Sequence, residues 1–460
     1  MRLSVIGTGY LGAVHAACMA ELGHEVLGVD NDARKIASLA DEQAPFYEPG
    51  LAEMLISHVS SGRLRFSTSL ADAAEFADVH FICVGTPQLA GALKADLSSL
   101  YAVIQGLAPK LTRDCLLVGK STVPVGTAPH LITRLAELTP GGVRAGLAWN
   151  PEFLREGFAV EDTLRPDRLV AGVVSSGDDA VLRTVYAKLL DAGTPYIVTD
   201  LATAELAKVA ANAFLATKIS FINAMSNVCE VVGADVVTLA DVLGHDGRIG
   251  RRFLSAGLGF GGGCLGKDIR AFTARASELG VADSVQFLHQ VDAINTARRS
   301  RAKDLARDLV GGDFDGRNVA VLGAAFKPET DDVRDSPALS VATAIRSEGA
   351  SVWVHDPKAI DNARNVHPEL EFTDDLIKAC EAADIILHLT EWEQYRSLDP
   401  AVLLRVVRVP RILDGRNILP LTLWRDAGWT VRSMGAGGTS AQPTARWHQP
   451  PGEKRGSLDR

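Results

Sequence analysis

The sequence has no excess of basic charge and no long apolar run. Its 460 residues include 47 Lys and Arg against 56 Asp and Glu, for a formal net charge of -9. Nucleic acids and anionic membranes are bound by basic faces, so we expect neither as a partner. No apolar stretch approaches the roughly 20 residues that a membrane-spanning helix needs. These absences still leave room for local basic pockets that bind a phosphorylated small molecule.

The cysteines show no arrangement typical of disulfides or metal ions. The sequence contains no CxxC pair and no histidine cluster at metal-ligand spacing. Its first six residues enter a strand at once, without the apolar region or cleavage site of a signal peptide. We therefore expect reduced thiols, no metal centre and a cytoplasmic location. The six cysteines are Cys18, Cys83, Cys115, Cys229, Cys264 and Cys380.

The length of the chain predicts two or three domains, because it exceeds what one hydrophobic core holds. Short apolar runs alternate with helical patterns up to about residue 199, which is typical of a doubly wound sheet. Residues 203–232 form an Ala-rich helical pattern without Pro or Gly, and helix is expected to continue to about residue 310. Three later apolar runs repeat the first pattern. We expect two Rossmann-like doubly wound parallel-sheet domains joined by a long central helical segment, at 1–199, 200–310 and 311–434, and a disordered tail at 435–460.

The first 30 residues predict a strand, a glycine turn, a helix and a second strand. In this context the GxGxxG pattern of Gly7, Gly9 and Gly12 indicates dinucleotide binding at a helix N-terminus. Asp30 ends the second strand and is expected to bind the adenosine ribose and repel a 2′-phosphate, which favours NAD over NADP. Arg34 weakens that preference. The second α/β domain lacks the pattern, so we expect it to bind a different ligand.

One cysteine, Cys264, lies in a segment where five of ten residues are glycine, Gly-Phe-Gly-Gly-Gly-Cys-Leu-Gly-Lys-Asp at 259–268. Glycines let the backbone adopt positive φ and let a ligand approach the main chain. Lys267 and the N-terminus of a helix starting near Leu265 are expected to favour the thiolate. We therefore predict a nucleophilic cysteine and not a structural one.

Other polar residues are predicted to share its site. Lys208 and Asn212 lie four residues apart on the long helix and so on one face, although this spacing also fits a solvated edge. The segments 120–127 and 150–157 each follow a predicted strand end, where α/β sheets place their ligands.

Together these motifs resemble the UDP-glucose/GDP-mannose dehydrogenase family, most closely its branch that oxidises UDP-glucose. The resemblance extends from residue 1 to about residue 430. It is carried by Gly7–Gly12, Val84-Gly85-Thr86-Pro87, Lys120–Thr127, Asn150–Gly157, Ala204–Lys208 with Asn212, Asp246–Gly250, the Cys264 segment, Ala325–Pro328 with Asp331–Arg334, and Asp414–Asn417.

The resemblance implies a four-electron oxidation of UDP-glucose to UDP-glucuronate with NAD, a reaction of polysaccharide biosynthesis. In it, Cys264 would add to an intermediate aldehyde to form a thiohemiacetal, which is oxidised to a thioester and then hydrolysed. Lys208 and Asn212 would stabilise the oxyanion at C6.

The resemblance also assigns proton transfer and ligand binding. Asp268 with Thr122 would handle the proton, and Glu152 would act as general base for hydrolysis. Arg248 would reach the substrate of a neighbouring subunit, so we expect a homodimer or higher homo-oligomer. The implied cofactor-binding residues are Gly7, Gly9, Tyr10, Leu11, Gly12, Asp30, Arg34, Thr86, Thr122, Glu156, Lys267 and Arg334. The implied substrate-binding residues are Glu152, Phe153, Leu154, Lys208, Asn212, Arg248, Phe253, Ser255, Phe260, Gly261, Lys327 and Arg416, of which Lys327 and Arg416 would meet its phosphates.

Two positions depart from the family's usual loop: Gly263 replaces Ser and Gly266 replaces Pro. Gly266 makes the backbone beside the nucleophile more flexible, at a cost of about 0.5–1 kcal/mol relative to a stiffer residue. This predicts a slower or more mobile site.

Three alternatives stay open. One is a GDP-mannose or UDP-N-acetylmannosamine 6-dehydrogenase of the same family; another is a two-electron hydroxyacid dehydrogenase, which lacks the nucleophilic cysteine; the third is an NAD-binding sensor without catalysis.

Overall fold

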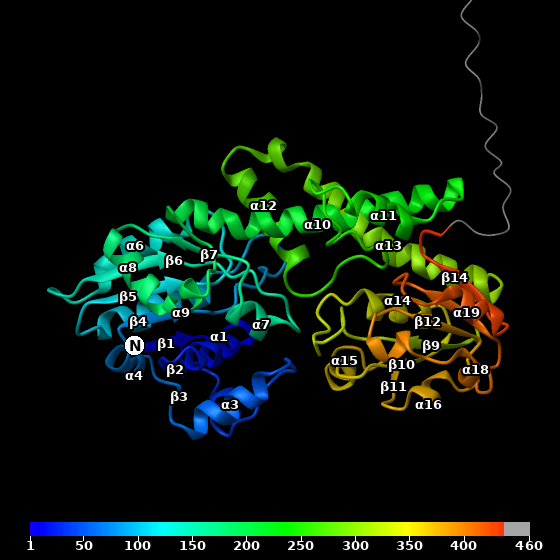
Figure 1. Cartoon of the computed structure of the whole chain (residues 1–460), viewed down its shortest axis with the longest axis horizontal. Coiled ribbons are helices and arrows are strands. Elements are labelled where there is room, and N and C mark those ends of the chain that lie inside the picture. The colour runs from blue at the N-terminus through cyan, green and yellow to red at the C-terminus, as the bar shows by residue number, and fades with distance from the viewer. Residues whose placement is uncertain (437–460) are drawn as a thin grey trace, which may run out of the picture.

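The computed structural model describes residues 1–436 and shows two α/β lobes joined by long helices (Figure 1). The sheet of the N-terminal lobe has the strand order β3-β2-β1-β4-β5-β6-β7-β8. Neighbouring strands are parallel, except that β6 and β7 are antiparallel. The strands are β1 (Arg2–Ile6), β2 (Glu25–Val29), β3 (Leu64–Ser67), β4 (Val79–Ile82), β5 (Cys115–Gly119), β6 (Ala145–Trp149), β7 (Leu169–Gly172) and β8 (Tyr196–Thr199).

Helices cover both faces of this sheet, which explains why its strands are apolar on both sides. One buried cluster surrounds α1 and another surrounds α5 and α6. The strand order reverses between β1 and β4, so the loops after these two strands flank the crevice where such sheets bind ligands. The helices are α1 (Tyr10–Glu21), α2 (Ala33–Ala40), α3 (Leu51–Ser60), α4 (Leu70–Phe76), α5 (Ser98–Leu107), α6 (Thr127–Leu138), α7 (Ala159–Leu164), α8 (Ser176–Val185) and α9 (Ala187–Asp191).

The C-terminal lobe holds a second, entirely parallel sheet in the order β11-β10-β9-β12-β13-β14. Its largest buried cluster contains residues from β9, β10, β12 and β13, while Phe372 of β11 and Val431 of β14 are partly buried and pack against it. The strands are β9 (Asn318–Leu322), β10 (Ser351–His355), β11 (Glu371–Phe372), β12 (Ile385–His388), β13 (Arg411–Asp414) and β14 (Thr430–Ser433). The helices are α14 (Pro337–Arg346), α15 (Ile360–Val366), α16 (Leu376–Cys380), α17 (Glu393–Arg396), α18 (Pro400–Leu403) and α19 (Leu421–Asp426).

The helix α10 (Leu201–Val232) connects the two lobes, as the sequence predicts (Figure 1). It begins where the Asp200 carboxylate accepts a hydrogen bond from the Thr203 amide at 2.8 Å, and it ends at Gly233 with φ +77°. Three further helices pack near it: α11 (Val236–Gly244), α12 (Leu265–Glu278) and α13 (Phe287–Val310). The predicted fold class is confirmed, but helix does not continue unbroken to residue 310. Residues 245–264 are irregular, and they deliver Cys264 to the start of α12.

The end of the described chain is attached to the central helices. The Val236 amide donates to the Gly435 carbonyl at 3.1 Å, and Ala436 forms a bridge with Asp235. The rest of the tail expected to be disordered, 437–460, lies outside the described residues. Among residues 1–436, no helix has the length and apolar character that crossing a bilayer requires, and no acidic, histidine or cysteine cluster is arranged to hold a metal ion.

Candidate active site

The turn between β1 and α1 has the geometry of a phosphate-binding turn. Gly7 has φ +91°, and a Cβ on Gly12 would lie 1.8 Å from the Gly7 carbonyl oxygen. Close packing of strand and helix therefore requires both glycines. A Cβ on Gly9 would meet no described atom within 4 Å, so the backbone before Tyr10 and Leu11, which begin α1, faces open space. The turn thus fits a pyrophosphate, which helix N-termini bind through free N–H groups.

Asp30 lies beside this turn at the end of β2. Its Oδ2 accepts hydrogen bonds from the Thr8 amide and from Lys35 Nζ, both at 2.8 Å. Burial alone would raise the pKa of Asp30, but the bond from Lys35 and the backbone amides lower it below its ordinary value. Arg34, expected beside Asp30, instead points into solvent and pairs with Asp32 at 3.8 Å. The cation next to the Asp30 carboxylate is therefore Lys35, which the sequence motif did not identify.

Cys264 is the last residue before α12, and its side chain is exposed to solvent. The protein around it, together with the carboxylates of Glu156 and Glu152, raises the pKa of the thiol to about 12, against a smaller opposite effect of Lys208. Water screens part of this effect without reversing its sign. Lys267 does not offset it, because its Nζ pairs with a neighbouring carboxylate at 2.8 Å. The direction of this shift opposes the thiolate that Lys267 and the helix N-terminus were expected to favour.

Lys208 and Glu152 form a buried ion pair beside Cys264. Lys208 Nζ lies 2.8 Å from Glu152 Oε1, and the two side chains are 7% and 14% exposed. Glu152 Oε2 accepts a hydrogen bond from the Leu154 amide at 2.6 Å, and the Phe153 ring centroid lies 5.8 Å from Lys208 Nζ. Burial alone would lower the pKa of Lys208, but Glu152 raises it above its ordinary value. A fixed ammonium therefore faces the thiol.

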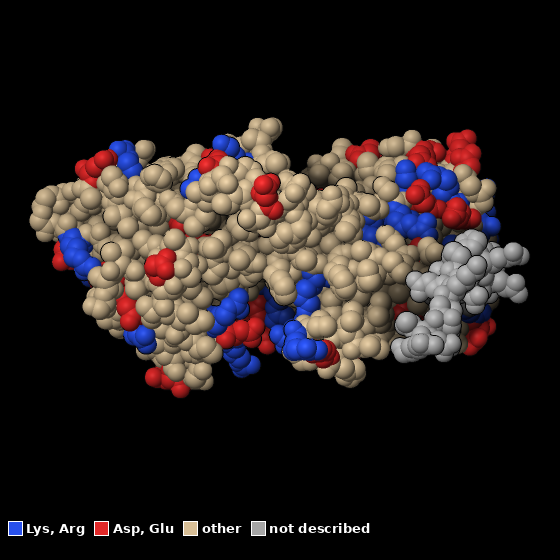
Figure 2. All heavy atoms as spheres, turned by 90° about the horizontal axis from the view of Figure 1, so that it is seen from above, with Lys and Arg blue, Asp and Glu red and all other residues tan. Residues whose placement is uncertain are grey.

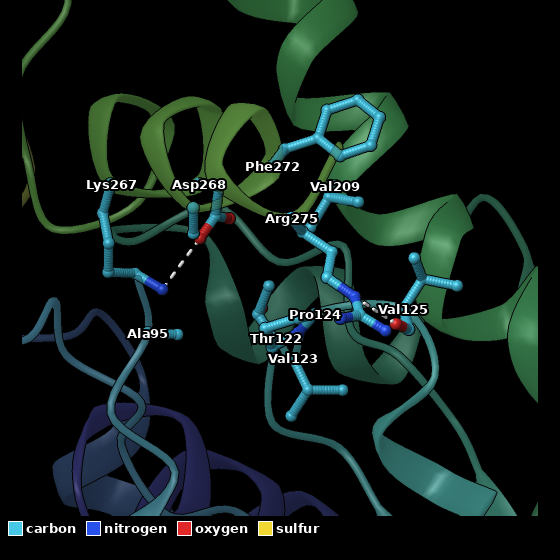
Figure 3. Close-up of a pocket in the computed structure, with 11 residues that line it drawn as sticks. Ala95, Thr122, Val123, Pro124, Val125, Val209, Lys267, Asp268, Phe272 and Arg275 are labelled. Carbon is cyan, nitrogen blue, oxygen red and sulfur yellow. Dashed lines mark hydrogen bonds and ion pairs between the residues drawn. The ribbon is translucent and has the colours of Figure 1, made fainter. Parts of the chain in front are cut away.

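Asn212 and Asp268 extend this cluster by one turn of α10. Asn212 Nδ2 donates to Asp268 Oδ2 at 2.7 Å, and Lys267 Nζ lies 2.8 Å from Asp268 Oδ1. Figure 3 shows these groups of α12 facing a small pocket that Thr122 also lines. The Thr86 hydroxyl donates to the Thr122 carbonyl at 2.7 Å. Asn212 and Lys208, which share a helix face, are both buried, so this face is not a solvated helix edge.

Charged groups of the C-terminal lobe complete the surroundings of Cys264. Arg334 Nη2 lies 3.0 Å from Glu156 Oε1 and 2.6 Å from Asp332 Oδ2. Burial and the facing Asp332 raise the pKa of Glu156 to about 7. Burial also lowers the pKa of Lys327, against the opposing charges of Glu156 and Cys264. Both lobes therefore supply charge to one site.

Two positions of the Cys264 segment must be glycine because the segment packs closely against the C-terminal lobe there. A Cβ on Gly261 would lie 2.4 Å from the Asp335 carbonyl oxygen, and one on Gly262 would lie 2.7 Å from the Phe326 ring. Phe260 packs its ring into a cluster between α10, α12 and α13. Gly261 and Phe260, expected at the substrate, are thus enclosed by protein because the two lobes meet at this segment.

The two departures in this segment each make room for an arginine. A Cβ on Gly263 would lie 2.5 Å from Arg334 Nη1, and one on Gly266 would lie 2.6 Å from Arg270 Nη2. Arg270 Nε also donates to the Gly266 carbonyl at 3.0 Å. Both arginine side chains end in flexible groups that can move aside, so neither glycine is required by the fold.

Arg416 lies where the Cys264 segment meets the C-terminal lobe. Its guanidinium donates to the carbonyls of Leu389 at 2.7 Å and of Gly259 and Phe326 at 3.2 Å each. It also pairs with Glu391 at 3.1 Å. Arg416 therefore ties the Cys264 segment to the C-terminal lobe, and its contact with the substrate phosphates stays a prediction from the sequence.

Three expected substrate residues lie outside this cluster. The Arg248 side chain is 90% exposed and pairs with Asp246 at 2.6 Å. Phe253 has a strained φ of +66°, and Ser255 is exposed. Their contact with the substrate stays a prediction from the sequence.

Two buried asparagines hold the Cys264 segment and were not evident in the sequence. Asn223 of α10 accepts a hydrogen bond from the Gly257 amide at 2.9 Å. Asn295 of α13 accepts from the Phe260 amide at 2.7 Å and donates to its carbonyl at 2.9 Å. A polar residue in an otherwise apolar helix face was the one available signal.

Known proteins share this architecture. The chain matches three domains of the UDP-glucose/GDP-mannose dehydrogenase family: the NAD binding domain at residues 1–190, the central domain at 202–297 and the UDP binding domain at 320–420. It is 42% identical over 420 residues to UDP-glucose 6-dehydrogenase of Rhizobium meliloti (strain 1021), which covers 91% of this chain and 95% of that protein.

Solved structures give the same result. A UDP-glucose dehydrogenase from the hyperthermophilic archaeon Pyrobaculum islandicum superimposes with a TM-score of 0.86 at 37% identity, over 95% of this chain and 98% of that one. A UDP-D-ManNAc dehydrogenase from Pyrococcus horikoshii gives a TM-score of 0.82 at 27% identity, over 95% and 100%. With all three domains matched in order, this chain belongs to the UDP-glucose/GDP-mannose dehydrogenase family.

Proposed function

We propose that this protein oxidises UDP-glucose to UDP-glucuronate with NAD, in two successive two-electron steps. The observation that carries the proposal is the thiol of Cys264 beside the buried Lys208–Glu152 ion pair. An enzyme that stops at the aldehyde has no use for a thiol, whereas oxidation to a carboxylate needs a covalent adduct. The 42% identity to the UDP-glucose 6-dehydrogenase of Rhizobium meliloti supports the same substrate.

The groups around Cys264 can perform this chemistry. The turn after β1 would hold NAD, and two NAD molecules bound there in succession would each accept one hydride. The Cys264 sulfur bonds to the aldehyde carbon while its proton passes to Asp268, and the carbonyl oxygen gains negative charge. The Lys208 ammonium and the Asn212 amide stabilise that oxygen. After oxidation of the adduct to a thioester, Glu152 accepts a proton from the attacking water and Cys264 leaves.

A panel of sugar nucleotides tests this function. With UDP-glucose we expect about two NADH per substrate consumed and UDP-glucuronate as product. A ratio of one would indicate a two-electron dehydrogenase, and no turnover of any donor would indicate a sensor. Activity with UDP-N-acetylmannosamine or GDP-mannose, but not with UDP-glucose, would instead assign the chain to another branch of the family; the similarity to the Pyrococcus horikoshii enzyme makes this the second candidate.

We further propose that two copies of the chain associate through α10. Three exposed apolar residues repeat every seven positions along it: Phe214 is 66% exposed, Phe221 48% and Val228 52%. This spacing places them on one helix face. Figure 2 shows the charged side chains unevenly spread over the surface, with wide areas of other residues between them. A second copy is the occupant we favour, because Arg248 projects from the same central segment and its side chain, apart from the pair with Asp246, is exposed.

Replacing Phe221 by Glu is therefore expected to convert a dimer into monomers, since burying a carboxylate in an apolar interface costs several kcal/mol. Light scattering coupled to gel filtration measures the mass directly. Val366→Glu in α15 replaces another exposed apolar helix residue, and this matched control leaves the mass unchanged. A parent chain that is already monomeric at micromolar concentration contradicts the proposal.

The cytoplasmic location stays a prediction from the sequence.

A further inference from the structure

The segment between α2 and α3 contains a buried carboxylate, Glu48, with an unusual set of partners. Glu48 is 5% exposed. Its oxygens accept hydrogen bonds from the amides of Gly157 at 2.7 Å, Ala159 at 2.6 Å and Val160 at 3.2 Å, and also from the Tyr10 hydroxyl. No Lys, Arg or His of residues 1–436 forms an ion pair with it, so backbone N–H groups and a phenol stabilise its charge.

These partners belong to the two loops that build the active site. Tyr10 is the first residue of α1, directly after the glycine turn. Gly157 follows Glu156, the carboxylate whose charge acts on Cys264. The Gly157 amide also donates to the Tyr10 hydroxyl at 2.8 Å, and the Tyr10 ring lies 4.7 Å from the Phe46 ring. Glu48 therefore holds the cofactor turn and the loop after β6 at one fixed spacing.

The neighbouring residue contacts the other lobe. The Tyr47 amide donates to Asp331 Oδ2 at 3.1 Å, and Lys358 Nζ lies 4.4 Å from the Tyr47 ring centroid. Gly157, with φ +80°, packs so closely against the C-terminal lobe that a Cβ would lie 2.5 Å from the Glu329 carbonyl oxygen. In Figure 1 the segment before α3 reaches toward the C-terminal lobe. Two adjacent residues thus connect the active-site loops to that lobe.

We propose that Tyr47 and Glu48 couple the position of the C-terminal lobe to the geometry of the cofactor turn, with Glu48 as the positioning residue. A nucleotide that fixes the C-terminal lobe fixes Asp331, and through Tyr47 and Glu48 it orders the turn that binds the dinucleotide. Binding of one ligand then strengthens binding of the other, and by reciprocity the same factor applies in both directions. This rests on the proposed function for the identity of the two ligands.

The test measures binding without turnover, using NADH and UDP. In the parent chain we expect UDP to tighten NADH binding by about 10-fold, within the usual range of such couplings. Asp331→Ala removes the acceptor for the Tyr47 amide and is expected to leave NADH affinity without UDP within 2-fold, while abolishing the tightening. Glu48→Gln places an amide against backbone donors and is expected to weaken NADH binding by about 10-fold even without UDP. Glu48→Asp keeps the charge and restores part of the affinity.

The exposed Glu53 of α3 supplies the control, since Glu53→Gln keeps the parent's affinities and coupling. Unchanged NADH affinity in a folded Glu48→Gln, or unchanged coupling in Asp331→Ala, overturns the proposal. If Glu48→Gln does not fold, Asp331→Ala decides alone. A parent chain that binds neither NADH nor UDP refutes the proposed function instead, so the two failures are distinguishable.

Discussion

Replacing Cys264 by Ser is expected to abolish formation of UDP-glucuronate, with a loss of at least roughly 10³-fold in turnover. A serine hydroxyl is a much weaker nucleophile than a thiol, so the aldehyde is not captured and NADH per UDP-glucose falls from about two to one or less. The Cys264 side chain is exposed, and the substitution is expected to change the free energy of unfolding by less than about 0.5 kcal/mol. Product analysis together with NADH absorbance measures both effects.

Cys115→Ser is the matched control for this substitution. Cys115 is a half-buried thiol in β5, at the opposite end of the strand from the active-site loop, and the variant keeps the stoichiometry of two. UDP-glucuronate made by Cys264→Ser at the parent's rate would show that the oxidation proceeds without a covalent adduct.

Replacing Lys208 by Met is expected to lower kcat by about 10²–10³-fold, the usual effect of removing one donor to a developing oxyanion. The substitution also leaves the buried Glu152 carboxylate without its partner, which is expected to lower the free energy of unfolding by about 3–5 kcal/mol. Glu152 keeps the pKa of Lys208 above its ordinary value, so the parent carries the ammonium throughout neutral pH. The variant has no ionisable group at this position, and a change of pH over that range is not expected to rescue it.

A double variant separates the two effects of Lys208. Lys208→Met with Glu152→Gln removes both charges, so most of the lost stability is expected to return while kcat stays low. Thermal melting and steady-state kinetics on the single variant, the double variant and the parent give this comparison. A Lys208→Met enzyme with kcat within 3-fold of the parent would exclude Lys208 from the chemistry.

Local patterns predicted the nucleotide turn because they depend on backbone geometry within a short segment. Gly12 is required by its close approach to Gly7, five positions earlier, and Gly7 by its positive φ. By contrast, the pattern identified Arg34 where Lys35 is the cation beside Asp30. The direction of each side chain depends on where α2 begins, and the Asp32 cap that decides this was not read from the sequence.

The charge state of Cys264 could not be predicted from neighbours in the sequence. Lys267 and the helix N-terminus both favour a thiolate, but Lys267 is paired with Asp268. The carboxylates of Glu152 and Glu156 come from a loop more than 100 residues away in the chain, and they raise the pKa of the thiol. Electrostatic effects depend on distances in space, which only the folded chain defines.

The two α/β lobes, the helix between them, the dinucleotide turn and the candidate nucleophile could be predicted from the sequence, because each depends on periodicity or on glycine within one short segment. The folded chain was needed to show which charges surround Cys264, why Gly261 and Gly262 are required, and that Arg416 binds backbone carbonyls. Those features arise where the two lobes meet. Contacts between residues far apart in the chain leave no pattern in a single sequence.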